Sequence, residues 1–230
     1  ENQFTDDDII LIMRDDLAFH PKNPHQGVIR ISPGGENLYR DVVIDYRADT
    51  LSTRDIEDIL LGNETERLST VLESTEVDNV LLYWTGHGTD KSFTWLETGE
   101  KFTDVQFGET VRKMYENKKY QSMLVCAEPC YSGSVVKAIE GIPLVLGFSA
   151  ASEDESSYAD NYSSELGVWM CDRFTYNLIR LYKGQNYINL LDVYKMLNAS
   201  TIGSNVKVYN YDYYYDLADV MLWDYFYDFN

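Results

Sequence analysis

Two short stretches of the sequence hold residue types suited to nucleophilic chemistry. The first, CAEPCYSGS at residues 126–134, places Cys130 after an apolar run and before small residues. The second, YWTGHGTD at residues 83–90, holds His87, one of three histidines in the chain. A cysteine nucleophile needs a neighbouring imidazole that takes its proton and later protonates the leaving amine. The two stretches therefore predict thiol acyl-transfer chemistry if the fold brings them together.

Each of these residues, taken alone, has a plainer interpretation. A cysteine at the end of a strand is usually a small buried hydrophobic side chain, and a lone loop histidine is usually a polar surface residue. The expected elements favour catalysis. Strands predicted at residues 79–84 and 122–127 flank a helix that begins at Thr103, and a right-handed crossover sets such strands parallel. Because ligand sites of α/β sheets lie at the carboxyl ends of strands, we expect His87 and Cys130 to be neighbours.

Strands alternate with helices along the chain, which predicts an α/β fold with a mainly parallel sheet covered by helices on both faces. Cys126 is expected in a strand and Cys171 in a helix, both as core residues. Further strands are expected at Ile9–Met13, at residues 143–151, at NVKVY and at VMLWDYF, with a hairpin around GVIRI and DVVIDY within residues 18–48. Further helices are expected after a capping pair at Ser52 and Asp55, from about Gly167 to Tyr182, and from about Leu190 to Asn198.

Composition limits the class of protein. The 230 residues suffice for one domain with a full core, and we treat residues 1–230 as a single domain. A net charge of −19 repels phosphate backbones, which argues against a nucleic-acid partner. Three cysteines without clustered histidines argue against a disulfide framework and against a zinc site. No apolar run reaches the roughly 18 residues that signal a membrane span.

At the two chemical stretches the sequence resembles the C13 cysteine peptidases, the family of legumain and of the catalytic subunit of the glycosylphosphatidylinositol (GPI) transamidase. The segment YWTGHG and the acidic-x-Cys-x-Ser-Gly pattern of EPCYSGS carry the resemblance. The segments IILIMRDDLAF, KMYENKKY and SAASEDESSYA support it in the same chain order. The resemblance implies a caspase-like fold of clan CD and a cysteine-type endopeptidase that needs no metal or cofactor.

The resemblance also implies roles for individual residues. Cys130 corresponds to the nucleophile and His87 to the general acid/base of the family. The backbone N–H groups of Gly88 and Cys130 correspond to the oxyanion hole. Each role falls on a residue of the two stretches singled out above.

Three further residues fall on the specificity pocket of legumain. Glu128 matches an acidic position of that pocket, and Ser156 matches a polar residue that lines it. An acidic group there suits an amide side chain such as Asn before the cleaved bond. Val168 stands where legumain has an acidic residue, so the pocket of this chain has one charge fewer and strict Asn specificity is open.

The family normally begins with another strand and helix before IILIM, which supply an Asn that orients the histidine and an Arg that lines the pocket. We expect this segment to be missing from the chain, through omission or cleavage, rather than from the working protein. An absent central strand would expose sheet edges and apolar surface.

Three functions remain open at this stage. The leading one is a legumain-type endopeptidase that cleaves a peptide or protein substrate after Asn, with Asp as the second candidate. The alternative is a transamidase, which would act in a membrane complex and pass the same thioester to an amine. A non-catalytic caspase-like binding module is the third, although such a module has no physical need to keep both His87 and Cys130. The family implies an extracytoplasmic setting.

Overall fold

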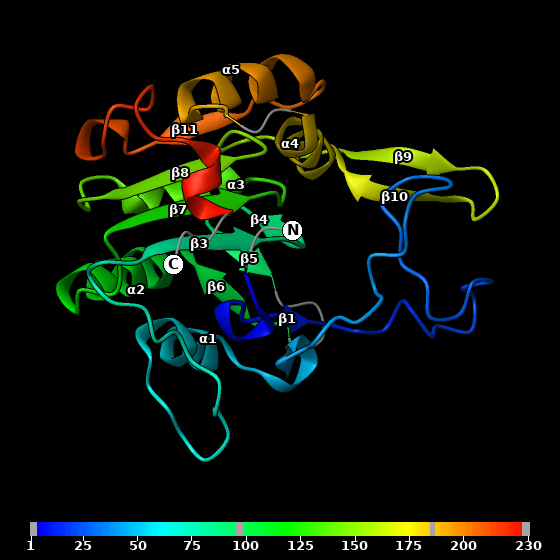
Figure 1. Cartoon of the computed structure of the whole chain (residues 1–230), viewed down its shortest axis with the longest axis horizontal. Coiled ribbons are helices and arrows are strands. Elements are labelled where there is room, and N and C mark those ends of the chain that lie inside the picture. Colours follow the sequence, from blue (N-terminus) through cyan, green and yellow to red (C-terminus); the bar gives the residue numbers. More distant parts are fainter. Residues whose placement is uncertain (1–3, 95–98, 185–186, 227–230) are drawn as a thin grey trace.

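Four strands form the central sheet, in the spatial order β11-β8-β7-β3 (Figure 1). The computed structural model describes residues 4–94, 99–184 and 187–226. Strands β3 (Asn79–Trp84), β7 (Ser122–Ala127) and β8 (Val145–Ser149) are parallel, and β11 (Lys207–Tyr209) pairs antiparallel with β8. Every residue of β7 and β8 is buried, as expected for parallel strands covered on both faces. The predicted strands at 79–84 and 122–127 and their parallel pairing are confirmed.

Helices cover both faces of the sheet, and alternate residues of β7 face the two layers. Met123, Val125 and Ala127 lie in a hydrophobic cluster with side chains of α1 (Thr53–Leu61), α2 (Asp104–Glu116) and α3 (Ser132–Val136). Leu124 and Cys126 lie in a second cluster with side chains of α4 (Arg173–Gly184) and α5 (Leu190–Ser200). The continuous apolar run of β7 therefore serves two cores at once. No helix in the described part of the chain is both long and apolar enough to cross a membrane.

Small sheets and single turns complete the structure. Strand β3 forms one edge of the central sheet among the described residues, and its residues 81–84 are half-buried. Three small sheets pair β1 (Ile12–Met13) in parallel with β2 (Tyr46–Arg47), β4 (His87–Thr89) with β5 (Ser92–Thr94) and β6 (Lys101–Thr103), and β9 (Ala159–Ser163) with β10 (Val168–Asp172). Single turns of 3-10 helix lie at Asp6–Asp8, Ala48–Thr50, Lys137–Ile139, Tyr211–Tyr213 and Leu222–Tyr225.

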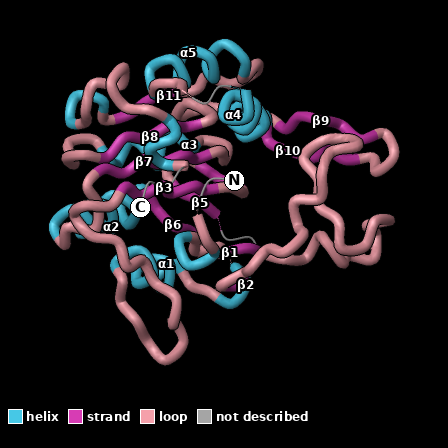
Figure 2. The backbone as a smooth tube through the Cα atoms, in the orientation of Figure 1, coloured by secondary structure: helices cyan, strands magenta, loops and turns pink. Residues whose placement is uncertain are grey.

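The predicted hairpin within residues 18–48 is wrong. Figure 2 shows residues 14–45 as a long loop that runs out to the β9–β10 hairpin. Asn161 Nδ2 donates to the carbonyl oxygen of Ile31 over 2.8 Å, and His25 contacts Glu165 over 2.8 Å. The GVIRI segment pairs with its own loop, where Leu38 N donates to the carbonyl oxygen of Ile29 over 2.9 Å, and forms no strand. The predicted strand at Ile9–Met13 shortens to β1.

The helix predicted from about Gly167 to Tyr182 is present as α4 but starts later than predicted, and the predicted strand VMLWDYF is wrong. Residues 168–172 form β10 rather than the start of a helix, because Gly167, at φ +67°, turns the chain back onto β9. Helix α4 begins only at Arg173, so Cys171 lies in a strand. The predicted strand VMLWDYF is a 3-10 turn whose Leu222 and Tyr225 are buried against the α4–α5 layer.

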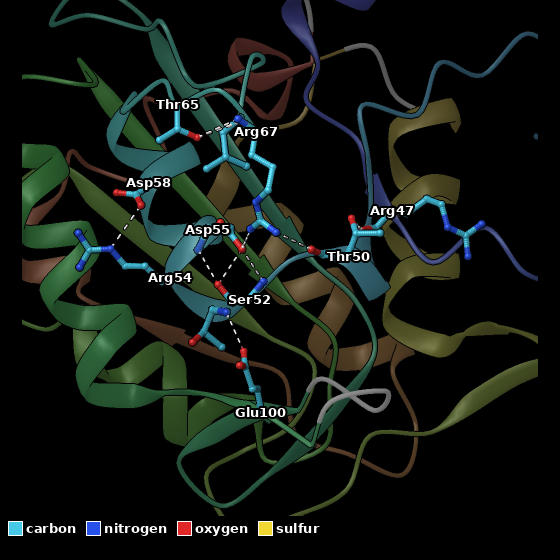
Figure 3. Close-up of polar contacts among 11 residues, drawn as sticks. Arg47, Thr50, Ser52, Arg54, Asp55, Asp58, Thr65, Arg67 and Glu100 are labelled. Carbon is cyan, nitrogen blue, oxygen red and sulfur yellow. Dashed lines mark hydrogen bonds and ion pairs between the residues drawn. The ribbon is translucent and has the colours of Figure 1, made fainter.

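Helix α1 begins at the predicted capping pair, drawn in Figure 3. The backbone N–H of Ser52 donates to Asp55 Oδ2 over 2.7 Å, and that of Asp55 donates to Ser52 Oγ over 3.3 Å. Arg67 pairs with the same carboxylate. Partial burial alone would raise the pKa of Asp55, but the bonds from Arg67 and Ser52 outweigh it and lower the pKa to about 2.

Replacing Asp55 by Ala should lower the free energy of unfolding by about 1–2 kcal/mol at pH 7, because the cap and the Arg67 partner are lost together. A lowered pKa contributes stability above the unfolded value near 3.8, and that stability is lost as the pH falls toward 2. The difference from wild type, measured by urea unfolding, should therefore shrink between pH 5 and pH 3. Asp212→Ala, which removes an exposed charge, is the control, and an equal loss in both variants would contradict the capping role.

Candidate active site

Two turns leave the sheet at the same edge. In the β3–β7 pairing Tyr83 lies opposite Cys126, and Trp84 lies opposite Ala127. The ladder continues for one more bond, since Glu128 N donates to the carbonyl oxygen of Trp84 over 3.0 Å. The turns that follow these strands, residues 85–88 and 128–131, therefore start side by side.

Gly88 brings the two turns into direct contact. A Cβ atom added at Gly88 would overlap the carbonyl oxygen of Cys130 and would lie 2.9 Å from Pro129 Cβ. Only a residue without a side chain allows the histidine turn to lie this close to the cysteine turn. The glycine that the sequence placed beside His87 is thus required by packing at the backbone of Cys130.

Gly88→Ala should force the two turns apart and destabilise the protein by roughly 1–3 kcal/mol, the usual cost of overpacking. The rate at which a small alkylating reagent modifies Cys130 should change as well. Gly184→Ala is the matched control, because open space surrounds Gly184. Urea unfolding and alkylation rates measure both effects, and identical behaviour of the two variants would rule out the close approach.

The thiol of Cys130 and the imidazole of His87 lie on adjacent turns. Cys130 Sγ, half-buried, lies 3.8 Å from both the carbonyl oxygen and the Oγ atom of Ser157. His87 is exposed at the start of β4. No hydrogen bond joins His87 to Cys130 in the part of the chain that the structure describes, and such bonds are often long until substrate binds.

The cysteine turn is held by the segment that contains Ser156. Tyr131 N donates to the carbonyl oxygen of Glu155 over 2.8 Å, and Gly133 N donates to that of Ala151 over 3.1 Å. Tyr131 adopts the left-handed conformation, with φ 59°, immediately before α3. A non-glycine residue in this region is strained and persists only when its surroundings hold it, as these two bonds do.

Glu128 is buried and its carboxylate has two hydroxyl partners. It is 7% exposed and accepts hydrogen bonds from Thr175, at the start of α4, and from Thr85, two residues before His87. Tyr83 Oη lies 2.6 Å from Thr175 Oγ1. Burial raises the pKa of Glu128, and the two hydroxyl groups partly oppose the shift.

Asp172 is a second acid, half-buried next to Glu128, that the sequence analysis did not single out. Its Oδ1 atom caps α4, accepting from Phe174 N over 2.7 Å and from Thr175 N over 3.4 Å. Burial and the charge of Glu128 raise the pKa of Asp172 to about 7. Asp followed by a helix-forming run is an N-cap signal, and it was missed because the helix was predicted to begin at Gly167.

The predicted site residues do not all lie together. At one edge of the sheet lie Cys130, His87, Gly88 and Glu128. Ser156 is half-buried between Glu155, which bonds to Tyr131, and Ser157, which contacts Cys130 Sγ. Val168 is exposed and pairs with Ser163, at the end of the β9–β10 hairpin remote from α4.

The other two cysteines are unsuited to nucleophilic chemistry. Burial raises the pKa of Cys126 to about 12. Burial, with the charges of Glu128 and Asp172, raises that of Cys171 to about 12. Because the thiolate is the reactive form, neither thiol reacts readily near neutral pH. A hollow of about 360 Å³ lies between residues 31–36 and α4, and none of the predicted site residues lines it.

Comparison with known proteins identifies the class to which this fold and site belong. The model of the Peptidase C13 family matches residues 1–218. The chain belongs to the peptidase C13 family, whose members are cysteine-type peptidases with the caspase-like α/β fold.

Relatives fall into two branches of the family. A Caenorhabditis elegans protein named putative GPI-anchor transamidase is 33% identical over 175 residues, which cover 74% of this chain and 54% of that protein. The vacuolar-processing enzyme delta-isozyme of Arabidopsis thaliana is 34% identical over 74% of this chain and 39% of its own length. Mouse legumain is 32% identical over 76% of this chain and 41% of its own length. The chain thus spans about half or less of the length of these relatives.

Proposed function

We propose that this chain carries out thiol acyl transfer on peptide substrates, with Cys130 as nucleophile and His87 as general acid/base. The observation that carries the proposal is the contact of Gly88 with the backbone of Cys130, which holds the histidine turn against the cysteine turn. Family membership supports the same chemistry. A binding module would not need the two reactive side chains on turns packed this closely.

The reaction proceeds in two halves. His87 takes the proton of the Cys130 thiol, and the sulfur attacks the carbonyl carbon of the peptide bond. The backbone N–H groups of Gly88 and Cys130 donate to the oxyanion that forms. The C–N bond then breaks, the amine leaves with the proton held by His87, and a thioester remains on Cys130.

The second half-reaction distinguishes peptidase from transamidase. Water, deprotonated by His87, attacks the thioester and releases the acid in a peptidase. An amine attacks the same carbon in a transamidase, and the thiol is regenerated in both reactions. The relative named putative GPI-anchor transamidase, matched over 54% of its length, is the observation that keeps the second function open.

For the side chain before the cleaved bond we propose Asn, with Asp second. Glu128 supplies a carboxylate that accepts from an amide N–H, and Ser156 supplies a hydroxyl group. Val168, which is exposed on β10, adds no charge, so the preference for Asn over Asp should be weaker than in an enzyme with a second pocket acid. The setting that we propose is extracytoplasmic, and the partner is a peptide or protein, within a membrane complex if the chain is a transamidase.

A peptidyl-Asn electrophile tests the nucleophile directly. Wild type should become labelled between pH 4 and 8, with mass added at the peptide containing Cys130. Cys130→Ala should lose labelling by about a hundredfold or more, because the acceptor sulfur is gone. Cys171→Ala, which removes a thiol of raised pKa, is the matched control and should label at the wild-type rate.

Cleavage rates of peptides with Asn, Asp or Ala immediately before the cleaved bond then rank the specificity. In a second assay, added hydroxylamine competes with water for the thioester on Cys130. Hydroxamate as the main product would favour the transamidase. Retention of labelling in Cys130→Ala would exclude the proposed nucleophile.

A further inference from the structure

Thr175, in the first turn of α4, holds two carboxyl groups at once. Its hydroxyl donates to Glu128 Oε2, and its backbone N–H donates to Asp172 Oδ1 over 3.4 Å. Because its one hydroxyl hydrogen points to Glu128, the bond of 2.6 Å from Tyr83 must be donated by the Tyr83 hydroxyl. A single residue thereby fixes the two acids as neighbours behind the cysteine turn.

The surroundings of these acids supply little positive charge. The titratable groups that face Asp172 are Glu128 at the end of β7, Tyr83 of β3, Cys171 of β10 and Arg173 of α4, and Asp160 of β9 lies opposite Cys171. Arg173 is the one cation among them, and its Nε donates to Asp160 over 2.9 Å. Two ionised carboxylates in such a place repel each other strongly, because the interior screens charge poorly.

We propose that Glu128 and Asp172 form a coupled carboxyl pair that carries one negative charge in the active enzyme, and that Asp172 is a positioning residue whose ionisation sets the upper pH limit of peptide cleavage. This inference rests on the proposed function. Both acids accept two hydrogen bonds, Glu128 from hydroxyl groups and Asp172 from backbone N–H groups, so they titrate as a pair, and we assign the second ionisation to Asp172.

The link to the reacting atoms runs through Glu128. This residue precedes Cys130 by two positions and accepts from Thr85, which precedes His87 by two positions. A second negative charge on Asp172 would push the Glu128 carboxylate away from its hydroxyl partners and loosen both turns. It would also disfavour the thiolate of Cys130 through added negative potential.

The pH profile of kcat/KM tests the pair, and the substrate is the best peptide of the panel above. For a group that ionises near pH 7, kcat/KM of wild type should fall about tenfold between pH 6 and pH 8. In Asp172→Asn the fall should shrink to about threefold or less, because Asn cannot ionise and caps a helix equally well. Asp212→Asn, which removes an exposed charge, should keep the wild-type profile.

Two Thr175 variants separate positioning from general damage. Thr175→Val keeps the shape and the backbone N–H but removes the hydroxyl donor to Glu128. The fall of kcat/KM on the alkaline side of the pH profile should therefore move to a different pH. Thr175→Ser retains the hydroxyl and should restore the wild-type profile. A limb that is unmoved in both Asp172→Asn and Thr175→Val would overturn the inference.

Thermal unfolding gives a readout that does not need activity. A pKa raised on folding contributes stability that is present at low pH and is lost as the pH rises through about 7. Wild type should therefore lose Tm between pH 5 and 8, and Asp172→Asn should lose less; equal losses would contradict the pair. If the Asp172 and Thr175 variants are active with the wild-type pH profile, this inference alone is contradicted. If no Cys130-dependent reaction occurs at any pH, the proposed function and this inference are both excluded.

Discussion

The parallel pairing of β3 with β7 is the constraint on which the site depends. Six residue pairs in register bring Trp84 level with Ala127, and the residues that follow them emerge together. A shift of this register by one residue would turn the alternate side chains of β7 to the wrong layers and separate the two turns. Both hydrophobic clusters therefore act, through this one strand, to keep His87 and Cys130 on neighbouring turns.

The parts of the fold that were predictable from sequence are those with a strong local pattern. The apolar runs of β3 and β7, the face of α2 formed by Phe107, Val111 and Met114, and the Ser52–Asp55 cap all follow from residue types and spacing. The neighbouring positions of the turns that carry His87 and Cys130 followed from topology, since a right-handed crossover places both strand ends at one edge.

The remaining parts depend on contacts between distant segments. The runs GVIRI and DVVIDY within the loop-rich residues 18–48 look like strands by composition, yet Asn161 and Glu165 of the hairpin region bond to Ile31 and His25 of this segment. The residue types at 168–172 are compatible with a helix or a strand, and the turn at Gly167 pairs them with β9 as a strand. With the helix predicted from Gly167, Asp172 falls inside that helix instead of at its N-terminus. The hydrogen bond from Thr175 to Glu128 joins residues far apart in the sequence, so no local pattern indicates it.

The two turns differ in how firmly the molecule holds them. The cysteine turn continues a strand whose residues are all buried, and left-handed Tyr131 is tied to the neighbouring segment at Glu155. His87 is the first residue of a three-residue strand, and its side chain is exposed. Amide hydrogens of β7 are thus positioned to exchange with solvent only when the whole domain opens, and those of β4 through local fraying. The two side chains of the candidate site therefore differ in their setting, because Cys130 follows a fully buried strand and His87 lies exposed on a short one.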